Sequence, residues 1–448
     1  MTTLSLIRLF SLFGLATESG AQNPQPRLDE YLTRAASLGR FSGSVLVADR
    51  GVVLLSKSYG LANQEWDLPN TPQTKFRIGS VTKPFTATAI MLLQQRGQLS
   101  VGEPVCKYVA DCPTAWRDLS IHHLLSHTSG IPNYMAFPDY ALTMRDPSDV
   151  AGLIARFRDK SLDFAPGTDY RYSNSGYILL GHIIERVSGV GYGQFVRANI
   201  LTPMGMANTG YDVPFRVLNQ RASGYSRANG AVINAPFIAM SITHSAGALF
   251  STVEDLYAFD QALYGDKLLS AKSLDSMFTA VRNNYGYGWG VDRQFNRRRL
   301  EHNGQVNGFT SIFSRYPDDR LTVIVLTNSD QTVPGVNRVA RDLAAIVFGE
   351  PYELPSAAPS VAVSPSVLAE YVGQYELAAN HFVVIARTAT GLSVQLTGSP
   401  PFEMRAESAT TFAVDVVDAR VVFVRGTTGA VTELVLQQGA EQRARKVR

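Results

Sequence analysis

The sequence predicts an α+β protein in two units, an antiparallel sheet flanked by helices and a smaller all-β unit. Strand patterns stand at both ends of residues 26–350 with helical patterns between them, and one sheet drawing strands from both ends accommodates that order. Residues 351–365 are rich in proline and small residues, which is typical of a semi-extended linker. Residues 366–448 alternate short apolar runs with turn residues, a pattern typical of a small antiparallel barrel or sandwich.

The first unit opens with an amphipathic helix over 26–38 and a hairpin over 44–60, in which two apolar runs flank an Asp-Arg-Gly turn. A buried helix is predicted over 80–96, where apolar residues recur at helical spacing and Gly97 ends the run. Residues 121–260 mix helical patterns with turn clusters. The middle of this unit is therefore expected to be mostly helical.

Strands return near residue 300, and a helix over 336–349 closes the first unit. The strand candidates there are RRLEHNG, FTSIFSRY and RLTVIVLTN. The second unit begins with one short helix, SVLAEYVG, followed by the strand candidates HFVVIA, LSVQL, TFAVDVV, ARVVFVR and VTELVLQQ.

Composition and charge exclude several classes of protein. The 448 residues carry 41 Lys and Arg against 38 Asp and Glu, a net charge of +3 that is close to neutral for this length. No basic stripe is present, so we expect no nucleic-acid partner. No apolar run reaches the roughly 18 residues that a transmembrane segment needs. With 45% hydrophobic residues, the chain has ample material for a buried core.

The N-terminus predicts a signal peptide over residues 1–21, and hence an exported protein, periplasmic or secreted. Arg8 precedes the short apolar run over 9–16, and the small residues Ser19 and Ala21 occupy the −3 and −1 positions of a cleavage site. An irregular N-terminal extension is the alternative.

The cysteines and histidines form no metal pattern. Cys106 and Cys112 lack the CxxC spacing and form either a local disulfide or two thiols. His123 and His127 stand four residues apart, but Leu124 occupies the position where the HExxH pattern requires glutamate, and a capped helix leading into a turn explains them better. No glycine-rich motif follows a strand as a nucleotide site requires, so we expect neither a metal nor a cofactor.

The sharpest local motif is Ser80-Val81-Thr82-Lys83 at a predicted helix start. The spacing places the hydroxyl and the amine on one helix face. A serine hydroxyl needs a base to become a nucleophile, and a lysine serves as that base if burial lowers its pKa. Taken by itself, the motif occurs by chance on many helices.

Two further polar motifs make a catalytic role of Ser80 and Lys83 more credible. Tyr172-Ser173-Asn174 offers a phenol that relays protons and an amide that holds a carbonyl or an ammonium group. His302-Asn303-Gly304 ends a predicted strand, where the glycine allows close approach by a ligand or another backbone. Each motif alone reads as an ordinary turn or strand end.

Together the three motifs resemble those of the serine β-lactamase and penicillin-binding-protein superfamily, specifically the class C β-lactamase-like branch of peptidase S12-type hydrolases and esterases. The flanking segments FRIGSVTKPFTA, IHHLLSHTSGIPNY, PGTDYRYSNSGYILLG and HNGQVNGF follow the family's order, and the resemblance spans about residues 26–350. It implies a β-lactamase-like sheet with an all-helical subdomain. The tail from 366 resembles the lipocalin-like β domain, a small barrel, of some members.

The resemblance also implies roles for single residues. Ser80 would be the nucleophile that forms an acyl-enzyme, and Lys83 and Tyr172 would share the general-base and general-acid work, with the first proton assigned to neither. Asn174 would orient the carbonyl side of the substrate. The backbone N–H groups of Ser80 and Gln305 would form the oxyanion hole, and His302 and Gly304 would border the substrate.

One departure from the family pattern bears on the substrate. Related enzymes carry K-T-G where this chain has His302-Asn303-Gly304, and the missing lysine is the cation that suits a substrate carboxylate. We therefore expect a D-amino-acid peptidase or esterase acting on a small or short-peptide substrate with an acyl or D-amino-acid group. A class C-like β-lactamase and a non-catalytic penicillin-recognising protein are the alternatives.

The charge of His302 and the role of the β unit can also be predicted. If His302 recognises a carboxylate, activity on such substrates should rise as the pH falls towards 6, since an unperturbed histidine has a pKa of about 6.5. The β unit is expected to restrict access to the cleft or to mediate a homo-oligomer.

Overall fold

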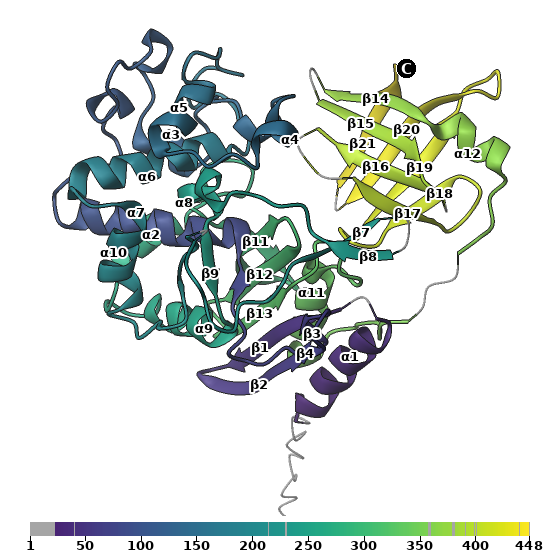
Figure 1. The fold of residues 1–448 in the computed structure, drawn as a ribbon, viewed down its shortest axis with the longest axis horizontal. Helices are drawn as coiled ribbons and strands as arrows, with labels where there is room; N and C mark the ends of the chain where they lie inside the picture. Colours follow the sequence, from purple (N-terminus) through teal and green to yellow (C-terminus); the bar gives the residue numbers. More distant parts are fainter. Residues whose placement is uncertain are drawn as a thin grey trace, which may run out of the picture.

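The computed structural model describes residues 23–447 except 40, 214, 229–230, 357–359, 379–380, 390, 398, 400 and 439. The predicted signal peptide lies outside the described residues. Figure 1 shows a central sheet with helices on both sides, a helical lobe at the upper left and a β-barrel at the upper right. The predicted α+β class, with a small barrel after the main unit, is confirmed. Among the described residues, no helix combines the length and apolar character needed to cross a bilayer.

The central sheet has the strand order β10-β11-β12-β13-β1-β2, with antiparallel pairs throughout. Strands from the beginning of the chain therefore pair with strands near residue 320, as the sequence order predicts. The strands are β1 (Gly43–Asp49), β2 (Val52–Tyr59), β10 (Gly290–Gln294), β11 (Arg297–Val306), β12 (Phe309–Tyr316) and β13 (Leu321–Thr327).

Alternating side chains on β1 divide the core between the two faces of this sheet. Val45 and Val47 pack in the cluster that includes α1 (Gln25–Ser37) and α11 (Val336–Phe348). Leu46 and Ala48 point the other way, into the large cluster around α2 (Thr82–Gln95). Successive side chains of a strand face opposite sides, so apolar residues at consecutive positions give a strand buried on both faces.

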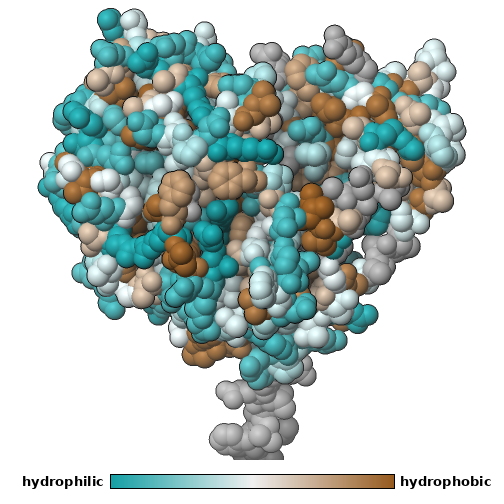
Figure 2. All heavy atoms as spheres, in the orientation of Figure 1, coloured by the Kyte–Doolittle hydropathy of each residue, from teal (hydrophilic) through white to brown (hydrophobic). Residues whose placement is uncertain are grey.

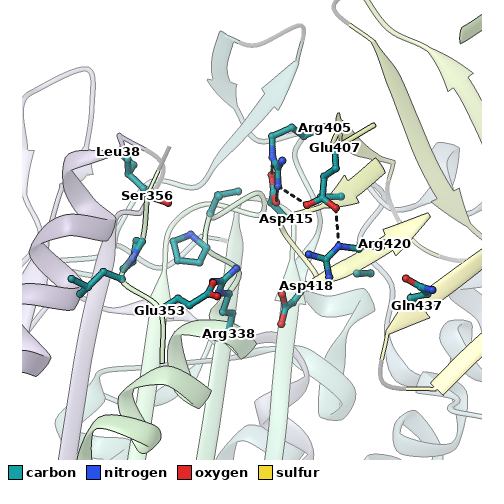
Figure 3. A pocket seen from close by; sticks show the side chains of 16 residues that line it. Leu38, Arg338, Glu353, Ser356, Arg405, Glu407, Asp415, Asp418, Arg420 and Gln437 are labelled. Carbon is teal, nitrogen blue, oxygen red and sulfur yellow. Dashed lines mark hydrogen bonds and ion pairs between the residues drawn. The ribbon is translucent and has the colours of Figure 1, made fainter. Parts of the chain in front are cut away.

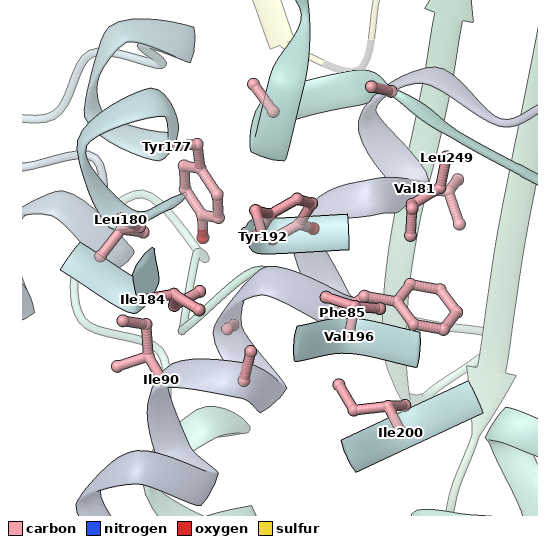
Figure 4. Packing of buried hydrophobic residues seen from close by; sticks show 14 of the residues in the cluster. Val81, Phe85, Ile90, Tyr177, Leu180, Ile184, Tyr192, Val196, Ile200 and Leu249 are labelled. Carbon is pink, nitrogen blue, oxygen red and sulfur yellow. The ribbon is translucent and has the colours of Figure 1, made fainter. Parts of the chain in front are cut away.

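Helix α2 runs through the middle of the core and is buried along nearly its whole length. Figure 4 shows its Phe85 and Ile90 surrounded by side chains of α6 (Asn174–Ser188) and α7 (Tyr192–Val196). The rigid surroundings fix the start of α2, where the SxxK motif lies. The other helices of this unit are α3 (Ile121–Leu125), α4 (Tyr140–Thr143), α5 (Val150–Arg158), α8 (His244–Gly247), α9 (Val253–Ala262) and α10 (Ala271–Met277).

The main unit also contains one local disulfide and several short strands outside the central sheet. Cys106 and Cys112, whose pairing the sequence left open, are joined by a disulfide. The short strands form three small sheets: β3 (Leu61–Asn63) with β4 (Leu68–Pro69); β5 (Phe76–Arg77), β9 (Leu249–Ser251) and β6 (Gly210–Tyr211); and β7 (Tyr225–Ala228) with β8 (Ala231–Asn234).

The C-terminal unit is a closed barrel preceded by α12 (Pro365–Tyr371). Aromatic side chains fill its core, where the rings of Tyr371 and Phe423 stack 3.9 Å apart. The five predicted strands are present, and three more complete the barrel. The strands are β14 (Gly373–Ala378), β15 (His381–Arg387), β16 (Leu392–Leu396), β17 (Phe402–Ala406), β18 (Thr411–Val414), β19 (Ala419–Arg425), β20 (Val431–Gln438) and β21 (Ala440–Lys446).

The barrel contacts the main unit through its β18–β19 turn, which packs on the start of α11. The Gly335 N–H donates to the Asp415 carbonyl oxygen at 3.3 Å, and a Cβ at Gly335 would lie 2.0 Å from the Val416 carbonyl oxygen. An ion pair between Arg341 and Asp418, 3.2 Å long, adds to this contact. The close backbone approach requires glycine at position 335.

A cavity of about 420 Å³ lies beside this contact. Figure 3 shows charged side chains from both units on its walls, with Glu407 held between Arg405 and Arg420. None of the predicted site residues lines it. Figure 2 shows polar and apolar residues interspersed over the face in view.

Candidate active site

Ser80 lies in a short 3-10 turn, Gly79–Val81, that leads from β5 into α2. Two hydrogen bonds tie this turn to β9: Ile78 N–H donates to the Leu249 carbonyl oxygen at 3.0 Å, and Leu249 N–H donates to Thr82 Oγ1 at 3.1 Å. The serine itself is half-buried, while its neighbours on both sides are buried. The hydroxyl is thus presented from a rigid support at the start of a helix.

Lys83 is completely buried, and its amine contacts the serine. Its Nζ donates to Asn174 Oδ1 at 2.8 Å and to the Ala246 carbonyl oxygen at 2.9 Å, and it lies 3.0 Å from Ser80 Oγ, where the lone pair of a neutral amine can accept from the hydroxyl. None of these three partners is a carboxylate. Burial lowers the pKa of the Lys83 ammonium well below its ordinary value, so the neutral amine that can accept a proton is favoured.

Tyr172 completes a triangle with these two residues. The Lys83 amine lies 4.7 Å from the centre of the tyrosine ring. Burial raises the pKa of the Tyr172 phenol, and a hydrogen bond with Ser80 acts in the opposite direction. The phenol therefore keeps its proton at neutral pH and is better suited to donate a proton than to accept one.

Asn174 is held at both ends of its side-chain amide. Its Oδ1 accepts from Lys83, and its Nδ2 donates to Asn133 Oδ1 at 3.3 Å and to Met135 Sδ at 3.0 Å. In this arrangement the amide holds the lysine amine in place, and both of its polar atoms already have hydrogen-bond partners. Sequence reasoning missed both residues: Asn133 lies in the segment IHHLLSHTSGIPNY, which supported only the family resemblance, and Met135 follows that segment.

Strand β11 lies directly against the turn that carries Ser80. A Cβ at Gly304 would lie 2.0 Å from the Ile78 carbonyl oxygen, and a Cβ at Gly79 would lie 2.8 Å from the Gln305 backbone nitrogen. Gly79 also has a φ of +49°, in the left-handed region that favours glycine. The two glycines thus allow the backbone segments that carry Ser80 and Gln305 to lie close together.

His302 lies on the same strand, is 5% exposed, and has partners at both ring nitrogens. Its Nδ1 lies 2.6 Å from the Asn303 carbonyl oxygen, which only accepts, so Nδ1 carries the proton. Its Nε2 then accepts from the Tyr285 hydroxyl at 2.9 Å. The ring is neutral in this arrangement.

Burial lowers the pKa of His302 to about 3. The expectation that His302 gains a positive charge near pH 6 is therefore wrong, because burial holds its pKa far below that of a free histidine. Tyr285, the partner of its Nε2, carries no sequence signal beyond an aromatic in a glycine-rich segment.

The histidine pair considered as a metal site is separated by the end of a helix. The predicted capped helix is present, since Ser120 and His123 form a reciprocal capping box at the start of α3. His127 lies beyond the end of α3 with a φ of +57°. Its ring packs 4.2 Å from the ring of Tyr172, so it belongs to the surroundings of the SxxK site.

Comparisons with known proteins agree with this geometry. Residues 28–347 match the family model described as Beta-lactamase, and residues 357–446 match a domain of unknown function (DUF3471). Penicillin-binding protein 4* of Bacillus subtilis is 28% identical over 457 residues, covering 94% of this chain and 99% of that protein.

Two solved structures share the fold, one over nearly the whole chain and one over about three quarters of it. The octameric penicillin-binding protein homologue from Pyrococcus abyssi has a TM-score of 0.67 and 25% identity, covering 94% of this chain and 99% of its own. The D-amino acid amidase from Ochrobactrum anthropi has a TM-score of 0.62 and 25% identity, covering 73% of this chain and 98% of its own. The family match spans most of the chain, and so the protein belongs to the β-lactamase and penicillin-binding-protein superfamily of serine hydrolases.

Proposed function

We propose that the protein hydrolyses amides or esters of D-amino acids and similar small acyl groups through an acyl-enzyme on Ser80. The observation that carries this proposal is the fully buried Lys83, whose amine touches Ser80 Oγ and whose hydrogen-bond partners among the described residues include no carboxylate. A lysine in such surroundings is a base at neutral pH.

The arrangement divides the proton transfers between two residues. As Ser80 Oγ bonds to the substrate carbonyl carbon, its proton passes to the neutral Lys83 amine. When the tetrahedral intermediate collapses, the bond to the leaving group breaks and the Tyr172 phenol donates a proton to that group. Tyr172 is reprotonated from the Lys83 ammonium, and water then releases the acyl group from Ser80.

The developing oxyanion needs hydrogen-bond donors. The backbone N–H groups of Ser80 and Gln305 are suited to that role, because Gly79 and Gly304 let the two segments meet without side chains between them. Preorganised backbone donors of this kind are usually worth a factor of about 100 to 1,000 in rate each.

The third motif supports a substrate without a carboxylate beside the reacting carbonyl. His302 is neutral, and both its nitrogens are engaged by Tyr285 and Asn303. It cannot replace the permanent cation that a lysine supplies at this position. Neutral amides and esters are favoured over β-lactams and peptide C-termini, and the similarity to a D-amino acid amidase supports the D-amino-acid class.

A parallel assay tests the substrate class. Nitrocefin, short-chain p-nitrophenyl esters and D-alanine p-nitroanilide are compared under one condition, with Ser80→Ala as the control. We expect turnover of the ester or the anilide, little of nitrocefin, and none by Ser80→Ala. Rapid nitrocefin hydrolysis would favour a true β-lactamase, whereas a folded protein with no turnover of any of the three would favour a binding role.

We also propose that the chain is exported and forms a homo-oligomer. The apolar N-terminal segment and the Cys106–Cys112 disulfide support export, since disulfides persist in oxidising compartments. The homologue from Pyrococcus abyssi is described as octameric. Cell fractionation tests the first proposal and light scattering of the purified protein tests the second.

A further inference from the structure

The segment that follows α3 holds the segment that carries Tyr172. The His127 carbonyl oxygen accepts from the Arg171 N–H at 3.0 Å. On the other side of the tyrosine, the Ser173 N–H donates to His127 Nδ1 at 3.2 Å. One residue therefore takes the backbone N–H groups immediately before and after Tyr172.

The imidazole also supports the tyrosine ring itself. The centres of the His127 and Tyr172 rings are 4.2 Å apart, and the Tyr285 ring packs on His127 at 4.7 Å. His127 is 1% exposed. A shift of this ring would leave a space beside Tyr172 in an otherwise packed region.

Two features of His127 are energetically unfavourable: its backbone conformation and an unpaired ring nitrogen. Its φ of +57° lies in the left-handed region, which a non-glycine residue rarely adopts. Its buried Nε2 has no hydrogen-bond partner within the described part of the chain, although Nδ1 accepts a hydrogen bond and Nε2 thus carries the proton. Strained backbone and an unpaired buried donor are common where a site demands a particular geometry.

We propose that His127 is a positioning residue for the catalytic reaction, which fixes the Tyr172 phenol where it can protonate the leaving group. It acts through Tyr172 and does not touch the substrate. This inference rests on the proposed function, since it assumes that Tyr172 serves as the general acid.

Burial lowers the pKa of His127 well below its ordinary value. The ring therefore stays neutral, with Nδ1 available to accept from Ser173. Two substitutions separate its contributions. His127→Phe keeps a ring beside Tyr172 but removes the acceptor, whereas His127→Asn keeps an acceptor and tolerates positive φ.

The dependence of the rate on the leaving group distinguishes a positioning role from a general loss of structure. A p-nitrophenolate departs without a proton, whereas an ethoxide needs one from Tyr172. The p-nitrophenyl and ethyl esters of one acyl group that the wild type accepts, butyrate or D-alanine, are compared for each variant. Thermal unfolding confirms that each variant folds. The matched control is His123→Ala, which changes a histidine in the preceding helix α3, near Gly167.

We expect His127→Phe to lower kcat on the ethyl ester about 100-fold, within the range of general acid catalysis, and to lower kcat on the p-nitrophenyl ester less than about 10-fold. His127→Asn should recover much of the ethyl ester activity, and His123→Ala should retain both activities. Equal losses on the two esters, or no loss on either, would overturn the inference. Failure of the proposed function is distinguishable, because the wild type would then turn over neither ester.

Discussion

Gly304 contacts the turn that carries Ser80, so adding a side chain at position 304 should displace that turn. In Gly304→Ala, the new Cβ would lie 2.0 Å from the Ile78 carbonyl oxygen and 2.5 Å from Ser311 Oγ. An ordinary carbon–oxygen contact is roughly 3.3 Å. The Ser311 side chain can rotate away, but the Ile78 carbonyl belongs to the backbone and cannot move by itself. Strand β11 and the Ser80 turn must therefore separate by roughly 1 Å.

That displacement sets the expected magnitude. The backbone N–H groups of Ser80 and Gln305 lie on the two segments that move apart, and a misplacement of about 1 Å costs on the order of 100-fold in rate. Overpacking a close-packed region also destabilises a fold by about 1–3 kcal/mol. We expect kcat to fall about 100-fold while the protein remains folded.

The assay measures kcat and KM on a p-nitrophenyl ester, together with urea unfolding. Gly191→Ala is the matched control, since its position has an ordinary φ of −61° and no atom within 4 Å of the added Cβ. The control should retain wild-type rates. If Gly304→Ala kept kcat within about threefold of the wild type, the proposed oxyanion geometry would be refuted.

Two further predictions concern the buried amine and imidazole. Lys83→Met should lower ester turnover by at least about 1,000-fold, because the nucleophile loses its base. The free energy of unfolding should not fall, because a buried amine is removed. Retention of a tenth of the wild-type kcat would contradict this prediction. His302 has a pKa of about 3 in the fold and roughly 6.5 in the unfolded chain, so below pH 6.5 only the unfolded chain gains this proton and stability falls as the pH drops. The loss from this group is about 1.4 kcal/mol per pH unit between those values, and urea unfolding of His302→Gln should show a shallower acid loss than the wild type; equal slopes would count against the neutral, buried histidine.

Much of the fold is readable from local patterns. The hairpin of β1 and β2 and the helix α11 were predictable because their apolar residues recur at strand or helix spacing. Strand β21 was not, because AEQRARK has almost no apolar side chain. Its place comes from pairing with β20, where Leu434 lies opposite Ala444, and from closure of the barrel through β14. Such pairing depends on the rest of the barrel.

The candidate site divides in a similar way. Ser80 and Lys83 are one turn apart on a helix, so their contact follows from spacing alone. His127 and Tyr285 meet Tyr172 only after distant segments have packed together. The neutral state of His302 also depends on burial, which a pattern of residue types does not display.

Covalent labelling identifies the nucleophile. The protein is treated with a fluorophosphonate, and the modified residue is located by mass spectrometry of its peptides. We predict a single adduct on Ser80, formed by the wild type and absent from Ser80→Ala. An adduct on another residue, or equal labelling of Ser80→Ala, would show that Ser80 is not the nucleophile.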